Sequence, residues 1–388
     1  NHPMQHQKII DAIKSQADKL SYIGPAFTVD IRAQLGERLS KIIPGGLNTS
    51  FFSDSGARAN EIAIIIAKNF TGKDKIIARK NSYHGATLGA ASVSGDIRRE
   101  MIDAKGYDTT FINDPHSYEL SVGSEKSLDY KSYINELLLT IERENPKKIA
   151  AVIMETISGS NLRIVPPKGY YEAVKEICEE NNIMLILDEV MTGFGRTGKW
   201  FGFSHWDMEP DILTLAKGLT SGTMPLGATV VSDKIANYYK NNYLPTGLTN
   251  FSHPIGCAAA LASIDVYENE KLIENSYYLG QLLDEELTRL KSRHNCIGSF
   301  RGKGLFYAIE FVDLNDKNKR LVEWHNSNYY HAHPLMKKLI KLLKEKGVYT
   351  YSRYNVLFIA PPLCIDKIEL LNAINIISES ITLTFEKN

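Results

Sequence analysis

The first residues that could take part in chemistry form a run of small side chains that leads into an apolar helical stretch. The run ends in Ser55-Gly56-Ala57. Backbone N–H groups at a helix N-terminus bind anions, so Gly56 and Ala57 could hold a phosphate ester, and the Ser55 hydroxyl could add a hydrogen bond. An Asp-Ser-Gly run is also an ordinary capped helix start, and both interpretations stay open.

Charged residues follow two apolar runs that predict buried strands. Asp188 and Glu189 follow residues 183–187, and Lys217 follows residues 212–215. Ligands of parallel α/β sheets gather at the carboxyl ends of strands, so the acidic pair is either functional or part of a turn. A lysine beside a buried strand end loses solvation, which lowers its pKa and makes Schiff-base chemistry feasible. The alternative for Lys217 is a solvated loop.

The order of these features favours one cofactor. The possible phosphate site is followed by Tyr83-His84-Gly85 and then by the strand-end acid Asp188, and Lys217 lies 29 residues after that acid. Pyridoxal phosphate needs an anion site, a ring to stack on, a carboxylate that keeps its pyridine nitrogen protonated, and a lysine. The sequence therefore predicts a pyridoxal-phosphate site.

Two further motifs suggest other functions. Gly193–Gly198 matches GxGxxG after a predicted strand, as in a nucleotide-binding dehydrogenase, and nearly matches a Walker A loop. A dinucleotide site needs a helix directly after the glycines, and no helical pattern follows them. Trp200 stands where a Walker A loop needs Ser or Thr. His331-Ala332-His333 has no acid pair nearby, so we expect a polar loop there and no metal.

The elements that must position these residues alternate between strands and helices. Between residues 50 and 233, apolar runs without polar alternation are joined by amphipathic stretches such as 169–182. This pattern indicates an α/β domain with a mostly parallel sheet covered by helices. The strands are expected at residues 76–78, 149–154, 183–187, 212–215 and 228–231.

The chain changes character after about residue 276. Two strands are expected at residues 304–312 and 356–360, and two amphipathic helices at residues 335–346 and 368–385. This mixture indicates a smaller α+β domain. The first 20 residues predict one helix outside both cores. The expected division is an N-terminal helical segment (1–25), a large domain (26–275) and a small C-terminal domain (276–388).

Composition narrows the class of protein. The 388 residues include 45 Lys and Arg against 45 Asp and Glu, so the net charge is zero and nothing favours binding to nucleic acid or to anionic lipid. The apolar runs are far shorter than the roughly 20 residues of a membrane span. Four well-separated cysteines without a CxxC pair predict neither a disulfide framework nor a zinc site, and they favour a reducing, cytoplasmic location.

Over essentially its whole length the chain resembles the class III pyridoxal-phosphate-dependent aminotransferases, which have the fold-type-I architecture. The run Asp-Glu-Val-Met-Thr-Gly-Phe-Gly-Arg-Thr-Gly, at residues 188–198, is a signature of that family, so the resemblance accounts for the GxGxxG pattern. The other segments that carry the resemblance are 53–61, 83–85, 184–187, 210–211, 215–218, 225–227, 247–254, 301–305 and 360–363.

The resemblance implies a role for each residue around the cofactor ring. Lys217 would carry the cofactor, and Asp188 would pair with the pyridine nitrogen. Val190 would pack on one face of the ring and Tyr83 would stack on the other. Glu155 would also belong to the cofactor site.

The phosphate of the cofactor would lie at a second group of residues. Ser55, Gly56 and Ala57 would bind it in one subunit, and Thr249 would reach it from the neighbouring subunit. The resemblance therefore implies a homodimer, or a dimer of dimers.

The chain departs from the family pattern around the substrate. Met191 stands where many members have a Gln that bonds the phenolic oxygen of the cofactor. Members that handle glutamate commonly have a Glu at the position of Ser160 and an Arg at the position of Phe358. Because both are replaced, we expect another cation to meet the carboxylate of the 2-oxo acid, and Arg353 is the nearest replacement.

The activity that the resemblance implies is transfer of an amino group from a primary amine or ω-amino acid to a 2-oxo acid, by a ping-pong mechanism. An aminomutase or a decarboxylating transaminase would share most of this site and stays an alternative; a dehydrogenase is a more remote one. Asn1-His2-Pro3 corresponds to a family motif that other residues usually precede. We expect those residues, some of which line the substrate pocket, to be disordered or removed.

Overall fold

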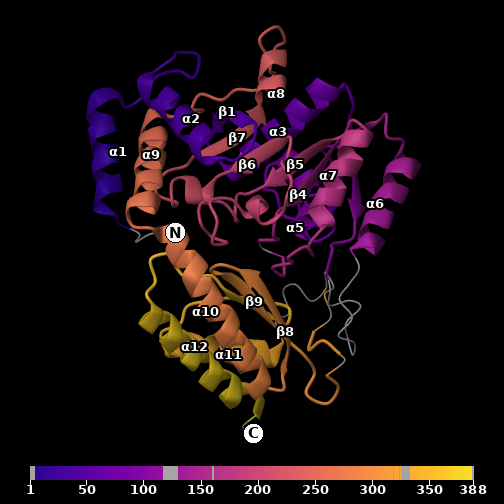
Figure 1. Ribbon diagram of the computed structural model, residues 1–388, viewed down its shortest axis with the longest axis vertical. Helices are drawn as coiled ribbons and strands as arrows, with labels where there is room; N and C mark the ends of the chain where they lie inside the picture. Colours follow the sequence, from indigo (N-terminus) through magenta and orange to yellow (C-terminus); the bar gives the residue numbers. More distant parts are fainter. Residues whose placement is uncertain are drawn as a thin grey trace.

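The computed structural model describes residues 5–116, 130–159, 161–317, 319–322, 324 and 333–386. These residues form a larger part around a seven-stranded sheet and a smaller part around a four-stranded sheet (Figure 1). Among them, no helix is both long enough and apolar enough to span a membrane.

The large sheet has the strand order β1-β7-β6-β5-β4-β2-β3. Neighbouring strands from β3 to β6 run parallel, whereas β7 pairs antiparallel with both β6 and β1. The predicted α/β class with a mostly parallel sheet is therefore confirmed. The strands are β1 (Leu47–Ser53), β2 (Lys75–Arg79), β3 (Thr109–Ile112), β4 (Ile149–Glu155), β5 (Met184–Asp188), β6 (Ile212–Leu215) and β7 (Gly227–Ser232).

Helices cover both faces of this sheet. On one face, α3 (Gly56–Thr71) buries Ile62 and Ile66 against alternate strand residues such as Ile186. On the other face, α7 (Tyr170–Glu180) packs with the intervening residues, among them Leu185. The remaining helices of the large part are α2 (Asp30–Ile42), α4 (Leu88–Ser92), α5 (Arg98–Met101), α6 (Lys131–Glu144), α8 (Asp233–Tyr238), α9 (Pro254–Asn269) and the 3₁₀ turns η2 (Gly202–His205) and η3 (Lys217–Leu219).

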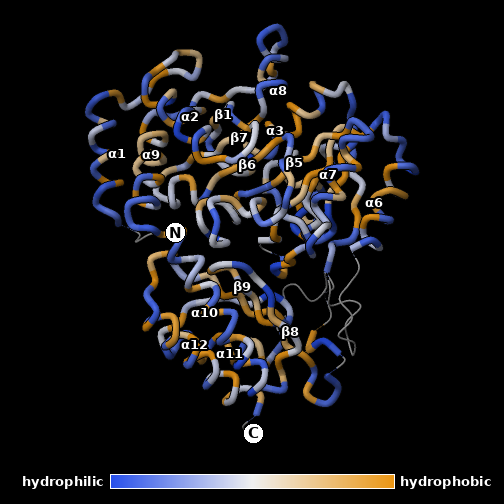
Figure 2. Tube along the Cα trace, in the orientation of Figure 1, coloured by the Kyte–Doolittle hydropathy of each residue, from blue (hydrophilic) through white to orange (hydrophobic). Residues whose placement is uncertain are grey.

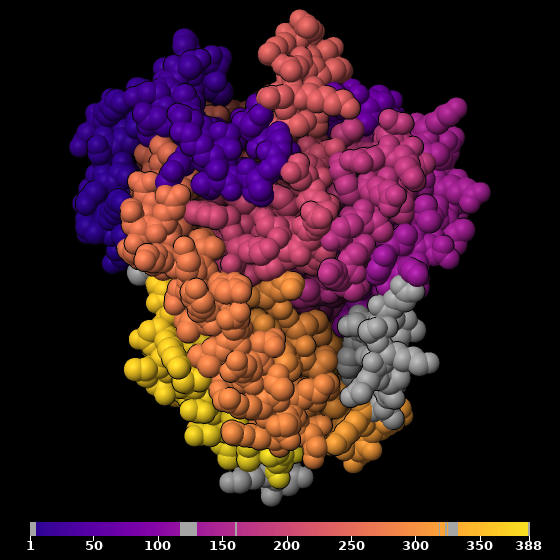
Figure 3. Space-filling view, viewed as in Figure 1, coloured from indigo at the N-terminus to yellow at the C-terminus, as the bar shows by residue number. Residues whose placement is uncertain are grey.

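Hydropathy follows this layering. The central strands carry hydrophobic residues along their length, and β4 is buried at every position (Figure 2). By contrast, α8 is hydrophilic and projects from the large part into solvent (Figure 2; Figure 3). Strands buried on both faces in this way explain why the sequence shows continuous apolar runs rather than alternation.

The N-terminal helix α1 (Gln7–Leu20) lies beside α9 (Figure 1). Its Ile9 is fully buried in the main hydrophobic cluster, and Ile13 packs against that cluster. The expectation that this helix lies outside both cores is therefore wrong. The apolar stripe of α1 gains burial by contact with α9, a helix that is almost apolar all round.

The smaller part is an antiparallel sheet of order β10-β11-β9-β8, covered by three helices. The residue at which we expected the second domain to begin falls inside α10, which runs from the large part into the small part (Figure 1). The elements are β8 (Ile297–Lys303), β9 (Phe306–Phe311), β10 (Ser352–Arg353), β11 (Val356–Ile359), α10 (Leu272–Arg293), α11 (Pro334–Glu345) and α12 (Lys367–Ile381), which continues into the π-helical turn Thr382–Glu386.

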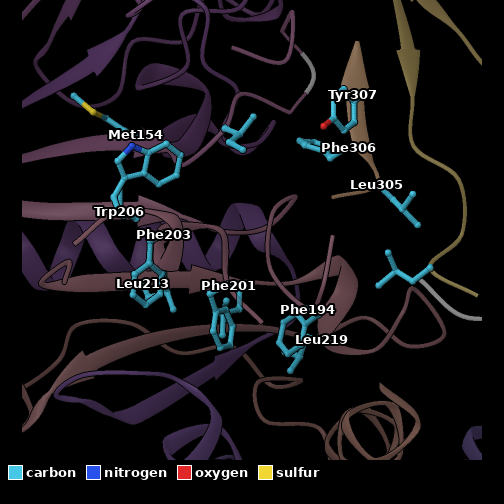
Figure 4. Packing of buried hydrophobic residues seen from close by; sticks show 14 of the residues in the cluster. Met154, Phe194, Phe201, Phe203, Trp206, Leu213, Leu219, Leu305, Phe306 and Tyr307 are labelled. Carbon is cyan, nitrogen blue, oxygen red and sulfur yellow. The ribbon is translucent and has the colours of Figure 1, made fainter. Parts of the chain in front are cut away.

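Buried aromatic residues connect the two parts. Figure 4 shows Phe194, Phe201 and Phe203 along the loop after β5, with Phe306 and Tyr307 of β9 nearby in the same cluster. The ring centroids of Phe194 and Phe201 lie 5.6 Å apart. Because one hydrophobic cluster includes residues of both sheets, burial of apolar surface holds the small part against the large part.

Candidate active site

A cavity of about 420 Å³ opens at the carboxyl ends of the central strands. The last residues of β4 and β5, the residues that follow β6 and the N-terminus of α3 converge on it. The structure brings together eight of the residues that the sequence singled out, namely Ser55, Gly56, Ala57, Tyr83, Glu155, Asp188, Val190 and Lys217. Ligands of parallel α/β folds bind at this edge of the sheet, so the cavity is the candidate active site.

Asp188 ends β5 and is almost completely buried. Its Oδ2 accepts hydrogen bonds from Asn60 Nδ2 (2.8 Å) and pairs with His84 Nδ1 (2.8 Å). Its Oδ1 accepts a hydrogen bond from the backbone N–H of Val190 (2.9 Å). Thr214 donates to Asn60 Oδ1 (2.7 Å) and fixes the orientation of that amide. The carboxylate is thus held rigidly at the cavity wall, where it can meet a protonated ring nitrogen.

Lys217 follows β6 and begins the 3₁₀ turn η3, with a φ angle of +35°. Its side chain remains accessible to solvent because it extends into the open cavity. The surrounding protein nevertheless removes much of its hydration, and this desolvation lowers the pKa of Lys217 despite the opposing charges of Asp188 and Glu155. A lysine with a lowered pKa has a larger neutral fraction and is a better nucleophile and base.

The N-terminus of α3 forms another part of the cavity wall. Ser55 is the N-cap, and its hydroxyl accepts a hydrogen bond from the N–H of Arg58 (3.4 Å). A Cβ on Gly56 would lie 3.0 Å from Val190 Cγ2 and 3.2 Å from Ala216 Cβ, so a larger residue would crowd these neighbours. The first N–H groups of the helix therefore face a site suited to an anion.

Glu155 ends β4 and holds the loop that carries Tyr83. Its Oε1 accepts a hydrogen bond from the Tyr83 N–H (2.9 Å), and its Oε2 accepts one from the Gly159 N–H (2.6 Å). Burial raises the pKa of the Glu155 carboxyl. Glu155 therefore positions the aromatic ring that lines the cavity.

Arg98 and Arg353 share one buried acid next to this ring. The Arg98 guanidinium lies 3.6 Å from the centroid of the Tyr83 ring. Asp96 pairs with Arg98 Nε (2.7 Å) and with Arg353 Nη2 (3.1 Å). Burial would raise the pKa of Asp96, but hydrogen bonds from Arg98 and the charge of Arg353 lower it. Arg353 lies in the short strand β10, and its side chain is only 9% exposed.

Other predicted positions lie elsewhere. Thr249 is exposed and does not line the cavity; its backbone carbonyl accepts a hydrogen bond from Tyr22 (3.1 Å). Met191 lines the cavity, as the sequence suggested for the position of the usual Gln. Ser160, His331 and Ala332 lie outside the described residues. Within the described ranges, no group of three potential metal ligands occurs.

The glycine-rich segment Gly193–Gly198 is a turn and is followed by η2, with no α-helix directly after the glycines. At its start, Glu189 accepts hydrogen bonds from the hydroxyls of Thr156 and Thr192 (both 2.6 Å) and from the N–H groups of Gly202 and Phe203 (2.8 and 2.7 Å). Glu189 therefore fastens this loop, and the helix that a dinucleotide site requires is missing from this described stretch.

The structure adds three residues whose roles the sequence did not indicate: Asn60, Arg98 and Arg163. Asn60 lies 128 residues from its partner Asp188, so no local pattern could reveal the contact. Arg163 is 1% exposed and stacks over Phe306, with 3.6 Å between the guanidinium carbon and the ring centroid.

The residues at the cavity fit pyridoxal phosphate. A helix N-terminus suits a phosphate, an anchored carboxylate suits a protonated pyridine nitrogen, and a desolvated lysine suits an aldehyde. Tyr83 and Val190 both line the same cavity and supply apolar surface for a ring. Fold and site together define a pyridoxal-phosphate enzyme of fold type I.

Comparison with known proteins gives the family. The family model Aminotransferase class-III matches residues 1–381. The adenosylmethionine-8-amino-7-oxononanoate aminotransferase of Methanocaldococcus jannaschii is 34% identical, over 97% of this chain and 85% of the relative. A taurine–pyruvate aminotransferase of Bilophila wadsworthia is 35% identical, over 79% of this chain and 70% of the relative.

A solved structure agrees with these matches. The taurine:2-oxoglutarate aminotransferase of Bifidobacterium kashiwanohense, in complex with pyridoxal phosphate and glutamate, has a TM-score of 0.90 and 33% identity, and the match covers 97% of this chain and 84% of that chain. The chain belongs to the class-III aminotransferase family. It is a pyridoxal-phosphate-dependent aminotransferase with the fold-type-I architecture, and the resemblance stated from the sequence is confirmed.

Proposed function

We propose that this enzyme transfers the amino group of a primary amine or ω-amino acid to a 2-oxo acid. Lys217 and Asp188 are its catalytic residues in this proposal. The observation that carries the proposal is the meeting of these two side chains, from adjacent strands, with the N-terminus of α3 in one cavity. The relative named for taurine supports a donor that carries its amine at one end and an acid group at the other.

Each residue has a distinct task in this proposal. When bound, pyridoxal phosphate supplies an aldehyde that takes over the amino group and a ring that accepts electrons. Lys217 Nζ moves the proton of the carbon that carries the amino group, and its lowered pKa favours the neutral form that accepts this proton. Asp188 holds the ring nitrogen protonated, while Tyr83 and Val190 confine the ring.

The remaining binding roles are also proposals. Ser55, Gly56 and Ala57 bind the phosphate through the N-terminus of α3, and Thr249 of one subunit reaches the site of the other. The exposed position of Thr249, away from the cavity of its own chain, supports a homodimer or a dimer of dimers. A cytoplasmic location is supported by four free cysteines in the described part of the chain.

Arg353 stays our prediction for the residue that binds the carboxylate of the acceptor. Its ion pair with Asp96 would have to open, or be shared, when a carboxylate arrives. Arg98 would keep Asp96 neutralised during that exchange because it contacts both oxygens of that carboxylate, at 2.7 and 3.2 Å.

A panel of amine donors, with pyruvate and 2-oxoglutarate as acceptors, tests the proposed reaction. We expect the holoenzyme to be yellow and borohydride to attach the cofactor to the peptide that contains Lys217. Lys217→Ala should still bind the cofactor through its phosphate but should turn over hardly at all. Labelling at another lysine would refute the assignment, and product formation without any added acceptor would favour an aminomutase or a decarboxylating enzyme instead.

A further inference from the structure

Arg163 is a buried cation without an acidic partner in the part of the chain that the structure describes. It lies on the loop after β4, between Phe306 of β9 and Phe358 of β11, with 3.6 and 4.8 Å from its guanidinium carbon to the two ring centroids. Its guanidinium donates a hydrogen bond to the carbonyl of Gly159 and is hydrogen-bonded to the side chain of Tyr351, whereas its Nε has no hydrogen-bond partner among the described residues. Burying an unpaired charge is costly, so a cation kept in this way needs a reason.

Arg353 offers a direct contrast within the same protein. Arg353 is paired with the buried carboxylate of Asp96, which Arg98 also contacts. Arg163 has two aromatic faces, a carbonyl oxygen and the side chain of Tyr351 as its neighbours instead. Of these two buried arginines, Arg163 therefore has the charge that an incoming acid can compensate without breaking an ion pair.

The cation of Arg163 lies directly behind the cavity wall. Gly159, which accepts its hydrogen bond, donates its own N–H to Glu155 Oε2 (2.6 Å). A Cβ on Gly159 would lie 2.5 Å from Met191 Cγ, so the loop is pressed against two residues that line the cavity. Burial lowers the pKa of Arg163 to about 10, which leaves it charged at neutral pH, and its charge helps to lower the pKa of Lys217.

The backbone holds Arg163 in this place at a conformational cost. Leu162 and Arg163 both have positive φ angles, +71° and +53°, which non-glycine residues adopt rarely. The Leu162 carbonyl accepts a hydrogen bond from Arg301 Nε of β8 (2.9 Å), and Leu162 packs with Phe358 of the small sheet. Contacts from the small part thus fix the strained loop that carries Arg163.

We infer that Arg163 binds the acidic group at the far end of the substrate, so that the enzyme selects amines that also carry a carboxylate or a sulfonate. This inference rests on the proposed aminotransferase reaction and names the substrate class of the same cavity. The free Nε–H and a terminal N–H of the guanidinium form the planar fork that binds such an anion through two hydrogen bonds.

The test isolates the first half-reaction, because the acceptor also carries a carboxylate. Without acceptor, each donor should bleach the visible absorbance of the holoenzyme, and the rate gives an apparent kcat/KM. The matched donors are 4-aminobutyrate, 3-aminopropane-1-sulfonate and butylamine, which lacks the acid. The variants are Arg163→Met, Arg163→Lys, Arg353→Met and, as a control, Arg289→Met, which removes a largely exposed arginine of α10.

Wild type and Arg289→Met should prefer the acidic donors over butylamine. Arg163→Met should reduce that preference by about 10- to 100-fold, as expected for the loss of one charge-assisted contact. Arg163→Lys should retain part of it, because the charge remains and the fork is lost. An unchanged preference in Arg163→Met, or a loss that occurs in Arg353→Met instead, overturns the inference. Failure of every donor to bleach the wild-type enzyme would instead refute the proposed function.

A binding measurement on the wild type keeps the inference testable if the variants do not fold. Isothermal titration of the holoenzyme with butyrate and with butyramide compares an acid with its neutral isostere. We expect butyrate to bind at least about tenfold more tightly. Propane-1-sulfonate tells whether the site accepts both anions or carboxylates alone. Equal affinity for butyrate and butyramide would contradict a cationic subsite.

Discussion

Replacing Asp188 with Asn tests the hydrogen-bond arrangement at the end of β5. Asn60 and His84 contact one carboxylate oxygen, and the Val190 N–H donates to the other. An amide has only one oxygen, so one side of residue 188 must then present an NH₂ group. If the NH₂ group faces Val190, it meets the Val190 N–H, and two donors oppose each other. If it faces Asn60, it meets the Asn60 NH₂ group, which cannot rotate away because Thr214 holds the Asn60 amide oxygen.

The size of the effect follows from this conflict. At least one hydrogen bond to a charged acceptor is lost, which costs about 1.5–3 kcal/mol, and a buried donor is left unpaired. We expect Asp188→Asn to lower the free energy of unfolding by about 2–4 kcal/mol. Activity should fall further, because an amide does not hold a proton on the ring nitrogen. A loss of about 3 kcal/mol in transition-state binding corresponds to more than 100-fold in kcat/KM.

Two measurements on one preparation check this prediction. Thermal unfolding of the apoprotein reports the loss of stability, and transamination of the best donor reports the loss of activity. Asp207→Asn is the matched control, since Asp207 is exposed and its substitution makes the same chemical change outside the cavity. The reasoning is refuted if Asp188→Asn unfolds at the wild-type temperature, or if it retains a near-wild-type rate.

Three further substitutions have defined outcomes. Burial raises the pKa of Glu155 above its usual 4.5, so the folded protein binds more protons than the unfolded chain above that pH. Stability therefore falls as pH rises through the folded pKa. Glu155→Gln should flatten this part of the curve of unfolding free energy against pH, and an unchanged slope counts against the prediction. Thr249→Ala should raise the dissociation constant of pyridoxal phosphate, measured by absorbance, without dissociating the dimer in sedimentation; a fully active monomer would contradict this. Arg353→Ala should raise KM for the 2-oxo acid while sparing uncharged amine donors, and identical kinetics in both half-reactions would dismiss Arg353 as an anchor.

The sequence predicted the inner strands of both sheets and missed the edge strands. Continuous apolar runs identified β2, β4, β5, β6 and β7 of the large sheet and β9 and β11 of the small sheet. The four strands that the runs did not identify are β1, β3, β8 and β10, which are the edge strands of the two sheets. Edge strands pair on one side only and are less buried, so sequences such as Asn48-Thr49-Ser50 carry no apolar run.

The candidate site shows the same division between local and distant information. Sequence order was enough to select Lys217 and Asp188, because each follows a buried strand and both strands end at the same edge of the sheet. It could not select Asn60 or Arg163, whose importance depends on contacts with residues far away in the chain. An arginine can be recognised as unpaired only when the residues around it are known.

The pair Asp188-Glu189 shows how neighbouring acids acquire different tasks. Successive side chains of a strand point to opposite faces, so two adjacent carboxylates at a strand end face different surroundings. Asp188 faces α3 and the cavity, where Asn60 and His84 hold it. Glu189 faces the other way and accepts four hydrogen bonds from the loop that follows. Burial raises the pKa of Glu189, and these four donors oppose that shift. Because the four hydrogen bonds hold the loop, substitution of Glu189 should loosen the loop that carries Phe203 and the small part packed against it. The sequence left a choice between a functional acid and a turn acid, and the hydrogen bonds place Asp188 at the cavity and Glu189 in the turn.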